Sequence, residues 1–550
     1  MINKNVANVL TDIAKIKKAK KDNRFSIGAY NKAAHFVIHS PQPIDQIDYH
    51  NVKGIGTKIA AHIDEFISTG KIQFREDNID LLDASSKIDD LLRIEGVGEK
   101  TALHIYNTLK ISTVDELKEA IDNGKINEVL KEKSIANILK GIDYIDKTRG
   151  RIRLDEGLDI AVKIYSYMKP YAKRIEAGGS IRRSTITVGD VDIAIVPLNN
   201  AKEVLEKFSQ MPIVDDIIDI GDKKTSVWIN GTRSDCYVFE EDNFEAGMQH
   251  LTGSATHNQK IRAIAKSKGL MLSQYGLKKG DKRIDNGTEE DIYHKLGFEF
   301  IPPEHRDGTT EFVDYKKGNQ VPELLTEADV TADYHIHSRW SDGKHSIEDI
   351  VQFAIMQKFK TIAITDHSQS LKIAKGLTIE KLRERNQEID RLQKKYPQIK
   401  ILKGAEVDIK ADGSLDYPDE ILDELDIVLA AIHTKTSGDV TDRYLQVIQS
   451  GKINIVSHLI GRIINERKGH TLNIERILQA CKDNNVALEF NCQPNRLDID
   501  DSIMSRCKEH GIKVAIGSDA HSKEQLVYAK SFGVWISKRA KLTKENLYDL

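Results

Sequence analysis

Seven short apolar segments in the last third of this 550-residue chain end in side chains suited to metal binding. They are ADYHIH, TIAIT, ILKGAEVD, IVLAAIH, INIVSH, VALEFN and KVAIGSDAH, and they deliver His335, His337, Asp366, His367, Glu406, His433, His458, Asn491, Asp519 and His521. Helix-like stretches separate them, which is the alternation of a parallel β/α barrel, and such barrels gather functional side chains at the carboxyl ends of their strands. Six imidazoles and several carboxylates in one cavity would be unstable unless divalent cations lay among them. The pattern predicts a hydrolytic site with several metal ions.

A second acidic group occurs near the middle of the chain. In VGDVDIAIV, Asp190 and Asp192 are two residues apart on a predicted strand. Both carboxylates should then point to the same face, about 7 Å apart, and two like charges so placed favour a pair of divalent cations. The hairpin SVWINGTRSDCYVF, with an Asn230-Gly231 turn, is expected to bring Asp235 beside them. This arrangement indicates nucleotidyl transfer, although acidic residues also occur at ordinary strand ends.

Residues that suit a triphosphate flank this acidic group. A turn at Gly179 and Ser180 precedes Arg183, and the segment LTGSATHN supplies Gly253 and Asn258 ahead of a basic helix. Backbone N–H groups at a helix start, a hydroxyl and a guanidinium together favour binding of phosphate oxygens.

A short repeat occurs in the first hundred residues. NVKGIGTKIAAHI and RIEGVGEKTALHI align without gaps, and each has two glycines followed by a lysine. The repeated residues are Gly54, Gly56 and Lys58 in the first copy, and Gly96, Gly98 and Lys100 in the second. Paired glycines allow a tight turn that leaves helix N–H groups facing a phosphate of a DNA backbone. The alternative is a helical hairpin that needs glycine only for close packing.

Composition narrows the class of protein. The net charge of −3 neither supports nor excludes binding to nucleic acid. If the protein binds nucleic acid, its lysines and arginines must be concentrated on one part of the surface. Four scattered cysteines without a C-x-x-C pair suit a reducing cytoplasm and argue against a disulfide framework. No apolar run is long enough for a membrane span, and the lysine-rich start is expected to be a first helix rather than an export signal.

Taken together, the glycine hairpins, GGSIRR, GDVD, the Asp235 strand, LTGSATHN, IPPEHR and the C-terminal ligand series resemble a bacterial family X DNA polymerase followed by a polymerase-and-histidinol-phosphatase (PHP) domain. The resemblance covers essentially the whole chain. It implies a multidomain α+β protein with all-α helix-hairpin-helix domains, an α/β nucleotidyltransferase palm and thumb, and a distorted (β/α)7 barrel of PHP type.

The resemblance also implies roles for residues. Asp190, Asp192 and Asp235 would be catalytic and hold two Mg²⁺ ions. Gly179, Ser180 and Arg183 would bind the triphosphate, and Gly253 and Asn258 the sugar and base. The first hairpin would grip the downstream 5′ side of a gap and the second the primer strand. Nine PHP ligands, with Glu406 bridging, would hold up to three ions, Mn²⁺, Zn²⁺ or Fe²⁺: His335, His337, Asp342, His367, Glu406, His433, His458, Asp519 and His521. Arg462 is a weaker candidate for contact with the scissile phosphate.

Two positions depart from the family pattern. Relatives that remove 5′-deoxyribose phosphate carry a Schiff-base lysine where this chain has His62, so we expect that lyase activity to be absent or weak. His250-Leu251 stands where animal relatives have a Tyr-Phe pair beneath the sugar, which puts discrimination against ribonucleotides in doubt.

The expected activity is gap-filling DNA synthesis in base-excision repair, with a 3′→5′ exonuclease and an abasic-site endonuclease in the PHP domain. The expected partners are gapped or nicked duplex DNA and dNTPs, for a cytoplasmic monomer without membrane contact. Alternatives are a DNA-binding repair scaffold with one inactive site, or a nucleotidyltransferase with a non-DNA acceptor. The predicted layout is 1–85 for the first helical domain, 86–147 for the second, 148–316 for palm and thumb, 317–330 for a linker and 331–550 for the PHP domain.

Overall fold

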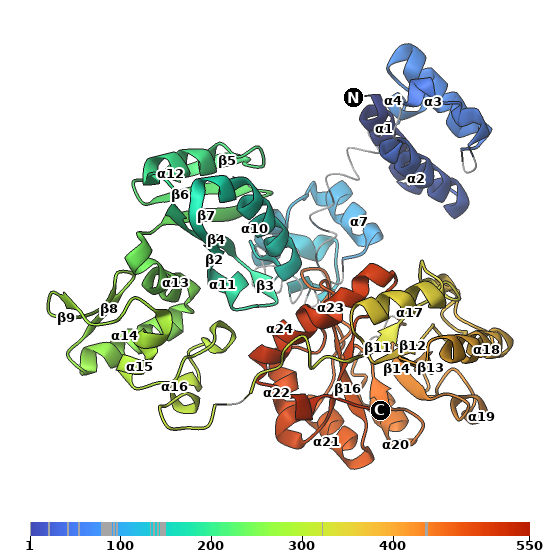
Figure 1. The fold of residues 1–550 in the computed structure, drawn as a ribbon. Coiled ribbons are helices and arrows are strands. Elements are labelled where there is room, and N and C mark those ends of the chain that lie inside the picture. Colours follow the sequence, from blue (N-terminus) through green and yellow to red (C-terminus); the bar gives the residue numbers. More distant parts are fainter. Residues whose placement is uncertain are drawn as a thin grey trace. The chain divides into compact units, whose positions relative to one another are not determined.

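The computed structural model describes residues 2–19, 22–40, 43–52, 55–78, 88, 91, 94, 97–132, 134–135, 138–139, 142, 150–321, 323–434 and 438–550. The chain forms two compact units, Met1–Arg149 and Gly150–Leu550 (Figure 1). The finer division given above stays a prediction. Among the described helices, none combines the length and the apolar character that crossing a membrane requires.

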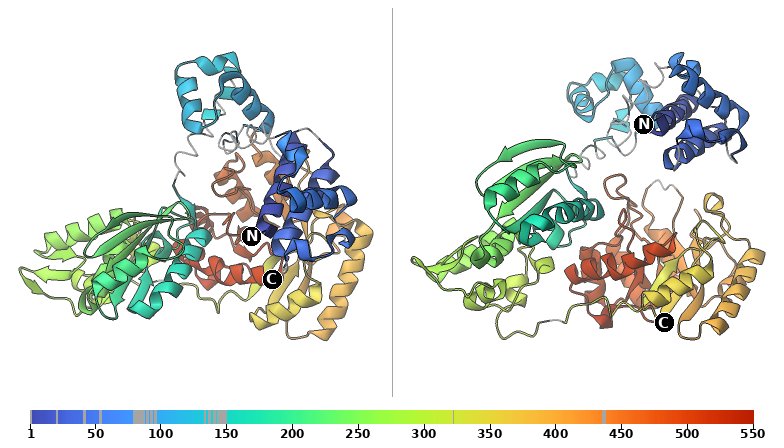
Figure 2. Two further views of the ribbon diagram at one scale, coloured as in Figure 1. Left: turned by 90° about the horizontal axis from the view of Figure 1, so that it is seen from above. Right: turned by 45° about the horizontal axis from the view of Figure 1, so that its top comes forward.

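The first unit is built from helices alone in its described part, as both views of Figure 2 show for the blue and cyan segments. Its helices are α1 (Ile2–Ala19), α2 (Arg24–His39), α3 (Thr57–Thr69), α4 (Gln73–Glu76), α7 (Glu99–Leu109) and α8 (Val114–Asp122). Buried side chains form two separate clusters, one between Val6 and Ile72 and the other between Ile88 and Ile142. Each glycine hairpin therefore has a hydrophobic core of its own.

The second glycine of each hairpin caps a helix. Gly56 precedes α3 and Gly98 precedes α7, both with extended backbone and neither with a side-chain cap. Their φ angles are −78° and −84°, so these two glycines do not need the left-handed region. Without a capping side chain, the first N–H groups of both helices remain available to an outside acceptor. Gly54 and Gly96 lie outside the described residues.

The second unit begins with mixed α/β structure. Its strands are β1 (Ile152–Arg153), β2 (Ala172–Ala177), β3 (Thr187–Val188), β4 (Asp190–Pro197), β5 (Asp216–Ile220), β6 (Lys224–Ile229), β7 (Thr232–Val238), β8 (Met271–Ser273), β9 (Gly276–Lys279) and β10 (Lys282–Arg283). Its helices are α10 (Leu154–Met168), α11 (Gly179–Arg182), α12 (Ala201–Ser209), α13 (Phe244–Thr252), α14 (Ala255–Ser267), α15 (Glu289–Leu296) and α16 (Glu311–Asp314).

The five-stranded sheet of this region has the order β2-β4-β7-β6-β5. The predicted hairpin is present: β6 and β7 pair antiparallel around Asn230 and Gly231, both at positive φ. Strand β7 lies parallel to β4, and the register sets Asp192 directly opposite Asp235. Two strands distant in sequence thus carry their carboxylates side by side.

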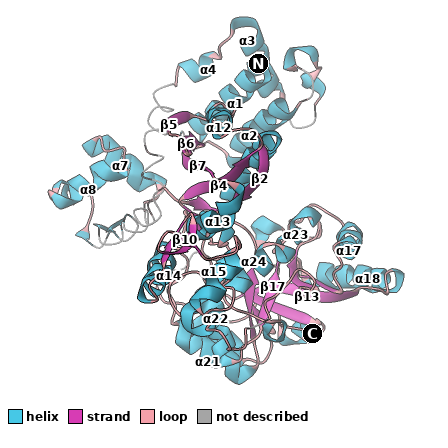
Figure 3. Ribbon diagram, turned by 60° about the vertical axis from the view of Figure 1, so that its left-hand side comes forward, coloured by secondary structure: helices cyan, strands magenta, loops and turns pink. Residues whose placement is uncertain are grey.

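The remainder of the unit is the barrel. Seven parallel strands follow in sequence order: β11 (Ala332–Ile336), β12 (Thr361–Ile364), β13 (Lys400–Asp408), β14 (Ile427–Ala431), β15 (Ile455–Val456), β16 (Ala487–Asn491) and β17 (Val514–Gly517). They alternate with helices α17 (Ile347–Met356), α18 (Ile379–Lys395), α19 (Asp419–Leu422), α20 (Thr441–Gln449), α21 (Ile474–Asn484), α22 (Asp501–His510), α23 (Val527–Lys530) and α24 (Phe532–Arg539). An Ile336–Ala520 bridge nearly closes the ring, whose strands are magenta in Figure 3. The predicted barrel of seven units is confirmed.

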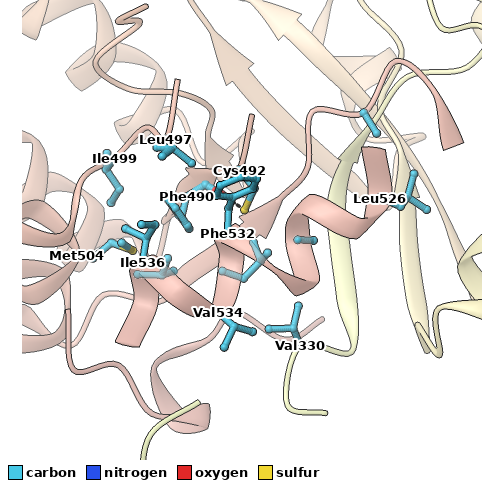
Figure 4. Close-up of a cluster of buried hydrophobic side chains, with 14 of the residues drawn as sticks. Val330, Phe490, Cys492, Leu497, Ile499, Met504, Leu526, Phe532, Val534 and Ile536 are labelled. Atoms are coloured by element: carbon cyan, nitrogen blue, oxygen red, sulfur yellow. Dashed lines mark hydrogen bonds between the residues drawn. The ribbon is translucent and has the colours of Figure 1, made fainter. Parts of the chain in front are cut away.

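Buried apolar residues on both faces fix the barrel strands between the inner space and the outer helices. Strands β14 and β16 are buried along their whole length, as expected of parallel strands covered on both sides. Figure 4 shows Phe532 and Ile536 of α24 near Phe490 of β16 and Met504 of α22. This packing holds the carboxyl ends of the strands, where the predicted ligand residues lie, in a fixed arrangement.

Candidate active sites

Glu406 is the centre of the cluster at the barrel mouth. Its carboxylate is 1% exposed and lies among five imidazoles. The ring nitrogens and their distances from its oxygens are His458 Nε2 at 2.7 Å, His367 Nδ1 at 2.8 Å, His433 Nε2 at 3.1 Å, His335 Nε2 at 3.3 Å and His337 Nε2 at 3.7 Å. A carboxylate so surrounded is well placed to bridge cations.

All nine predicted PHP ligands meet at this mouth. Three groups have donor atoms within 4.8 Å of one another: His337, Asp342, His367 and His521; His335, His337 and Asp519; and His367, Glu406 and His433. His458 joins them through Glu406. Shared members link the groups, which is the geometry expected of neighbouring metal ions with common ligands.

Charge coupling in the cluster is strong. Burial alone would raise the pKa of Glu406, but the imidazoles around it, led by His433, hold that pKa well below its ordinary value. Burial and neighbouring rings lower the pKa of His337 to about 4, so this imidazole is neutral at pH 7 and offers a lone pair. Burial opposes protonation of His433 too, yet Glu406 and Asp408 raise its pKa to about 10.

Among the residues that the structure describes, several buried atoms of the predicted ligands make no hydrogen bond of good geometry, even where a carboxylate oxygen lies close. They include Nε2 of His335, both ring nitrogens of His337, Nδ1 of His367 and Oε2 of Glu406. Buried polar atoms normally have partners, so this group of orphaned atoms needs a further occupant. Mixed imidazole and carboxylate donors suit Mn²⁺, Zn²⁺ or Fe²⁺. The residues present therefore fit a divalent metal centre.

Two residues near the predicted ligands, Asp366 and Arg462, make hydrogen bonds within the protein. Asp366 accepts hydrogen bonds from Ser338 N at 2.8 Å and Ser341 Oγ at 2.7 Å, and so shapes the loop before Asp342. The guanidinium of Arg462 donates to the carbonyl oxygens of residues 496 and 497, and its contact with the scissile phosphate stays a prediction. Arg462 orders the loop of Arg496, whose Nε lies 3.6 Å from Asp519 Oδ2.

In the palm, the structure sets Asp190 and Asp192 on β4 with Asp235 on the adjacent strand. Lys224 Nζ lies 2.6 Å from Asp235 Oδ2, and Arg233 Nε lies 3.0 Å from Oδ1. Burial raises the pKa of Asp235, but the hydrogen bonds from Lys224, Ser226 and Arg233 outweigh it and lower the pKa overall. Arg233 lies two residues before Asp235 on the same strand, whereas Lys224 lies on the neighbouring strand β6, so no spacing in the sequence reveals its contact with Asp235.

Asp192 has the pKa most affected by the crowding of carboxylates in the palm. Burial, followed by the charges of Asp190 and Asp235, raises its pKa to about 7. Gly179 adopts φ +57°, and a Cβ there would overlap Asp192 Oδ2. Glycine is thus required for the phosphate-side turn to approach the carboxylate.

The predicted nucleotide residues gather near this turn. Ser180 Oγ is buried and has no hydrogen-bond partner within the described part of the chain, so it remains available to a ligand. Arg183 donates through Nη1 to the carbonyl oxygen of Thr252, next to Gly253, which has φ +65°. Asn258 uses its amide internally, accepting from Gln249 Nε2 at 3.0 Å and donating to His250 O at 2.8 Å. Asn258 thus braces helix α13 in this structure.

The basic residues of the hairpins are exposed. Lys58 lies in the first turn of α3 and Lys100 in the first turn of α7, both at the surface. His62, one turn further along α3, contacts the Tyr30 hydroxyl through Nδ1 at 3.0 Å, and burial lowers its pKa. No amine occupies this position.

These folds and sites define a class: a nucleotidyltransferase with helix-hairpin-helix DNA-binding elements, joined to a metal-dependent phosphoesterase. Four family models match the chain, namely a helix-hairpin-helix domain over residues 1–72, a SAM-like helix-hairpin-helix tandem over 88–143, a DNA polymerase beta thumb over 247–307 and a PHP domain over 333–493.

The chain is also similar in sequence to known DNA polymerases and to a probable phosphatase. The DNA polymerase/3′-5′ exonuclease PolX of Bacillus subtilis (strain 168) is 32% identical over 543 residues, covering 96% of this chain and 94% of its own. DNA polymerase lambda of Arabidopsis thaliana is 24% identical over 347 residues, 56% of this chain and 62% of its own. A probable phosphatase of Thermoanaerobacter sp. (strain X514) is 30% identical over 203 residues, 34% of this chain and 78% of its own.

The chain belongs to the family X DNA polymerases that carry a C-terminal PHP domain. It is accordingly an enzyme, a DNA nucleotidyltransferase with a phosphodiester hydrolase domain of the 3′→5′ exonuclease kind.

Proposed function

We propose that this polymerase fills short gaps during base-excision repair, and that its PHP domain both trims 3′ ends and incises DNA at abasic sites. The observation that carries the proposal is the presence of two separate groups of crowded ligand side chains in one chain. One is acidic and lies in the palm, and the other is rich in histidine and lies at the barrel mouth.

In the palm, Asp190, Asp192 and Asp235 would hold two Mg²⁺ ions, which supply charge neutralisation for the triphosphate and activate the primer hydroxyl. Lys224 and Arg233 fix Asp235 from one side by the contacts given above. The free Ser180 hydroxyl and the Arg183 guanidinium, together with the turn at Gly179, would position the phosphates. Gly253 and Asn258 would line the sugar and base.

DNA would be held by its backbone at the two hairpins. Gly56 and Gly98 leave the first N–H groups of α3 and α7 uncapped by side chains, and Lys58 and Lys100 add positive charge in the same turns. Such contacts ignore base sequence, as gap filling requires. They also predict binding that weakens steeply with salt.

In the barrel, the nine ligands would hold up to three Mn²⁺, Zn²⁺ or Fe²⁺ ions, which activate water and clamp phosphate oxygens when bound. The neutral ring of His337 and the ionised Glu406 are already in the protonation states that ligation needs. Removal of a 3′ nucleotide and incision at an abasic site are both hydrolyses of a phosphodiester. One site can therefore perform both reactions.

The test uses a duplex with a tetrahydrofuran abasic analogue, which cannot undergo β-elimination because it has no aldehyde. The wild-type protein should incise beside the analogue and then add nucleotides from the new 3′ end. His337→Ala should lose incision but still extend a pre-cut substrate. Absence of incision by the wild type across a Mn²⁺, Zn²⁺ and Fe²⁺ series would refute the abasic-site part of the proposal.

A matched comparison tests gap filling. Extension of a primer across a one-nucleotide gap with a 5′-phosphate should exceed extension on an open template, and the double replacement Lys58→Ala, Lys100→Ala should reduce that preference. Lys110, which follows α7 and lies outside both repeats, supplies the control replacement. Equal rates on both templates would contradict the gap-filling role.

A further inference from the structure

Two buried carboxylates lie behind the ligand cluster, on the side of the histidines that faces away from its centre. Glu489 Oε1 lies 2.6 Å from Nδ1 of His335, and Asp408 Oδ1 lies 2.6 Å from Nδ1 of His433. The second nitrogen of each ring points the other way, to Glu406, at 3.3 Å for His335 Nε2 and 3.1 Å for His433 Nε2. Each ring thus lies between a rear carboxylate and the centre of the cluster.

Glu489 is held in place by several contacts. It is 1% exposed on β16, and its Oε2 accepts from Ser457 Oγ at 2.6 Å and from the backbone N–H of His458 at 2.7 Å. The neighbouring strand β17 has Gly517 at this level, where a Cβ would overlap Glu489 Oε1. One carboxylate therefore ties His335 of the first strand to the segment that carries His458.

Asp408 repeats the arrangement at the end of β13. Its Oδ2 accepts from Ser370 Oγ at 2.6 Å, and its backbone N–H donates to Ser368 Oγ at 3.0 Å. The carboxylate is therefore fixed before it meets His433.

A neutral imidazole carries one N–H, and the acceptor that this N–H faces decides which nitrogen keeps a lone pair. When a cation displaces the proton from Nε2, a carboxylate at Nδ1 holds the remaining proton there, so that Nε2 is the ligating atom. We infer that Glu489 and Asp408 are positioning residues that set the tautomer and orientation of His335 and His433 for a divalent cation. This inference rests on the proposed metal centre.

Glu489→Gln is the sharpest variant. To keep the two hydrogen bonds from Ser457 and His458, the amide must place its oxygen at the Oε2 position. Its NH₂ group then faces His335 Nδ1 and donates to it, which shifts the ring proton to Nε2, the ligating atom. The replacement therefore reverses the tautomer while keeping the size of the side chain.

The experiment measures metal binding by the full chain, independent of turnover. Metal-free wild type, Glu489→Gln, Asp408→Asn and the control Asp426→Asn are titrated with Co²⁺, and visible absorption and elemental analysis give affinity and stoichiometry. Asp426 precedes β14 at the opposite end of the barrel, where it accepts from Lys403 N at 2.8 Å. We expect both variants to lose about 10- to 100-fold in affinity for one cation, with the control unchanged.

The outcomes are separable. If the full chain carrying Asp190→Ala, which removes a palm ligand, binds no cation, the proposed metal centre of the barrel itself fails. If the wild type binds cations and Glu489→Gln, folded by circular dichroism, binds them equally well, the positioning role is overturned. Should Glu489→Gln not fold, Asp408→Asn decides by the same criterion, and failure of both to fold would show that the carboxylates act in folding instead.

Discussion

Replacing Asp192 by asparagine should stabilise the metal-free polymerase at alkaline pH while abolishing synthesis. Burial and the charges of Asp190 and Asp235 raise the pKa of Asp192 from 3.8 to about 7. At about 1.4 kcal/mol per pH unit, this rise corresponds to about 4 kcal/mol. Asparagine carries no charge, so it avoids this cost.

Proton linkage determines how the free energy of unfolding changes with pH. The folded state keeps the Asp192 proton up to about pH 7, whereas the unfolded chain loses it near pH 4. The stability that comes from the neutral carboxyl is therefore complete below about pH 4 and is lost as the pH rises to about 7. The advantage of Asp192→Asn should be about 1 kcal/mol at pH 4.5 and approach about 4 kcal/mol at pH 8, less any cost of unmatched amide hydrogens.

The chain offers a local reporter for this measurement. Its three tryptophans are Trp228 on β6 of the palm sheet, and Trp340 and Trp535 in the barrel region. In a Trp340→Phe, Trp535→Phe background, urea unfolding followed by Trp228 fluorescence reports on the palm alone. Samples in EDTA at pH 4.5, 6, 7 and 8 are compared with and without Asp192→Asn, with Asp219→Asn on the exposed edge strand as control.

Magnesium completes the test. Mg²⁺ should stabilise the wild-type palm at pH 8, because cations relieve the crowding of carboxylates, and should stabilise Asp192→Asn much less. A stability difference that does not change with pH, or equal stabilisation of both proteins by Mg²⁺, would refute the reasoning.

Three further predictions concern single positions. Glu406→Gln should lower exonuclease activity at least 100-fold and release bound metal, because the Glu406 carboxylate faces five imidazoles. Elemental analysis and digestion of a labelled 3′ end measure the two effects. A variant that retains both metal and full activity would contradict this prediction. Gly179→Ala should reduce polymerase kcat/KM by 10-fold or more, because the new Cβ meets Asp192 Oδ2 at a positive φ; unchanged single-nucleotide kinetics would argue against that contact. The wild type should form no borohydride-trapped adduct on an incised abasic substrate and His62→Lys should form one; efficient trapping by the wild type would refute the assignment.

The barrel and its ligands were predictable because the information is local. Short apolar strands and the helical stretches between them mark the β/α units, and eight of the nine predicted ligands lie in or shortly after one of these strands. Asp342 is predicted only from the family resemblance. In a parallel β/α barrel the carboxyl ends of all strands lie at the same end, so these nine residues come together once the barrel forms. The register of β6 and β7 follows in the same way from the Asn230-Gly231 turn, whereas the pairing of β7 with β4 joins distant segments.

Contacts between distant segments could not be read from the sequence. His335 and Glu489 are 154 positions apart, so no spacing rule links them. Lys224 meets Asp235 only because two strands pair, and Arg462 turns toward carbonyl oxygens that a loop supplies 34 and 35 residues later. The residues that support a site depend on tertiary neighbours, whereas the predicted ligands follow strand ends.

We expect one chain to contain two independent metal-dependent sites with opposite effects on a 3′ end. The most direct measurement follows a 5′-labelled primer on gapped DNA, with dNTPs and without, for the wild type, Asp190→Ala and His337→Ala. Asp190→Ala should degrade but not extend the primer, and His337→Ala should extend but not degrade it. Loss of both activities in either variant, or of neither, would contradict the account.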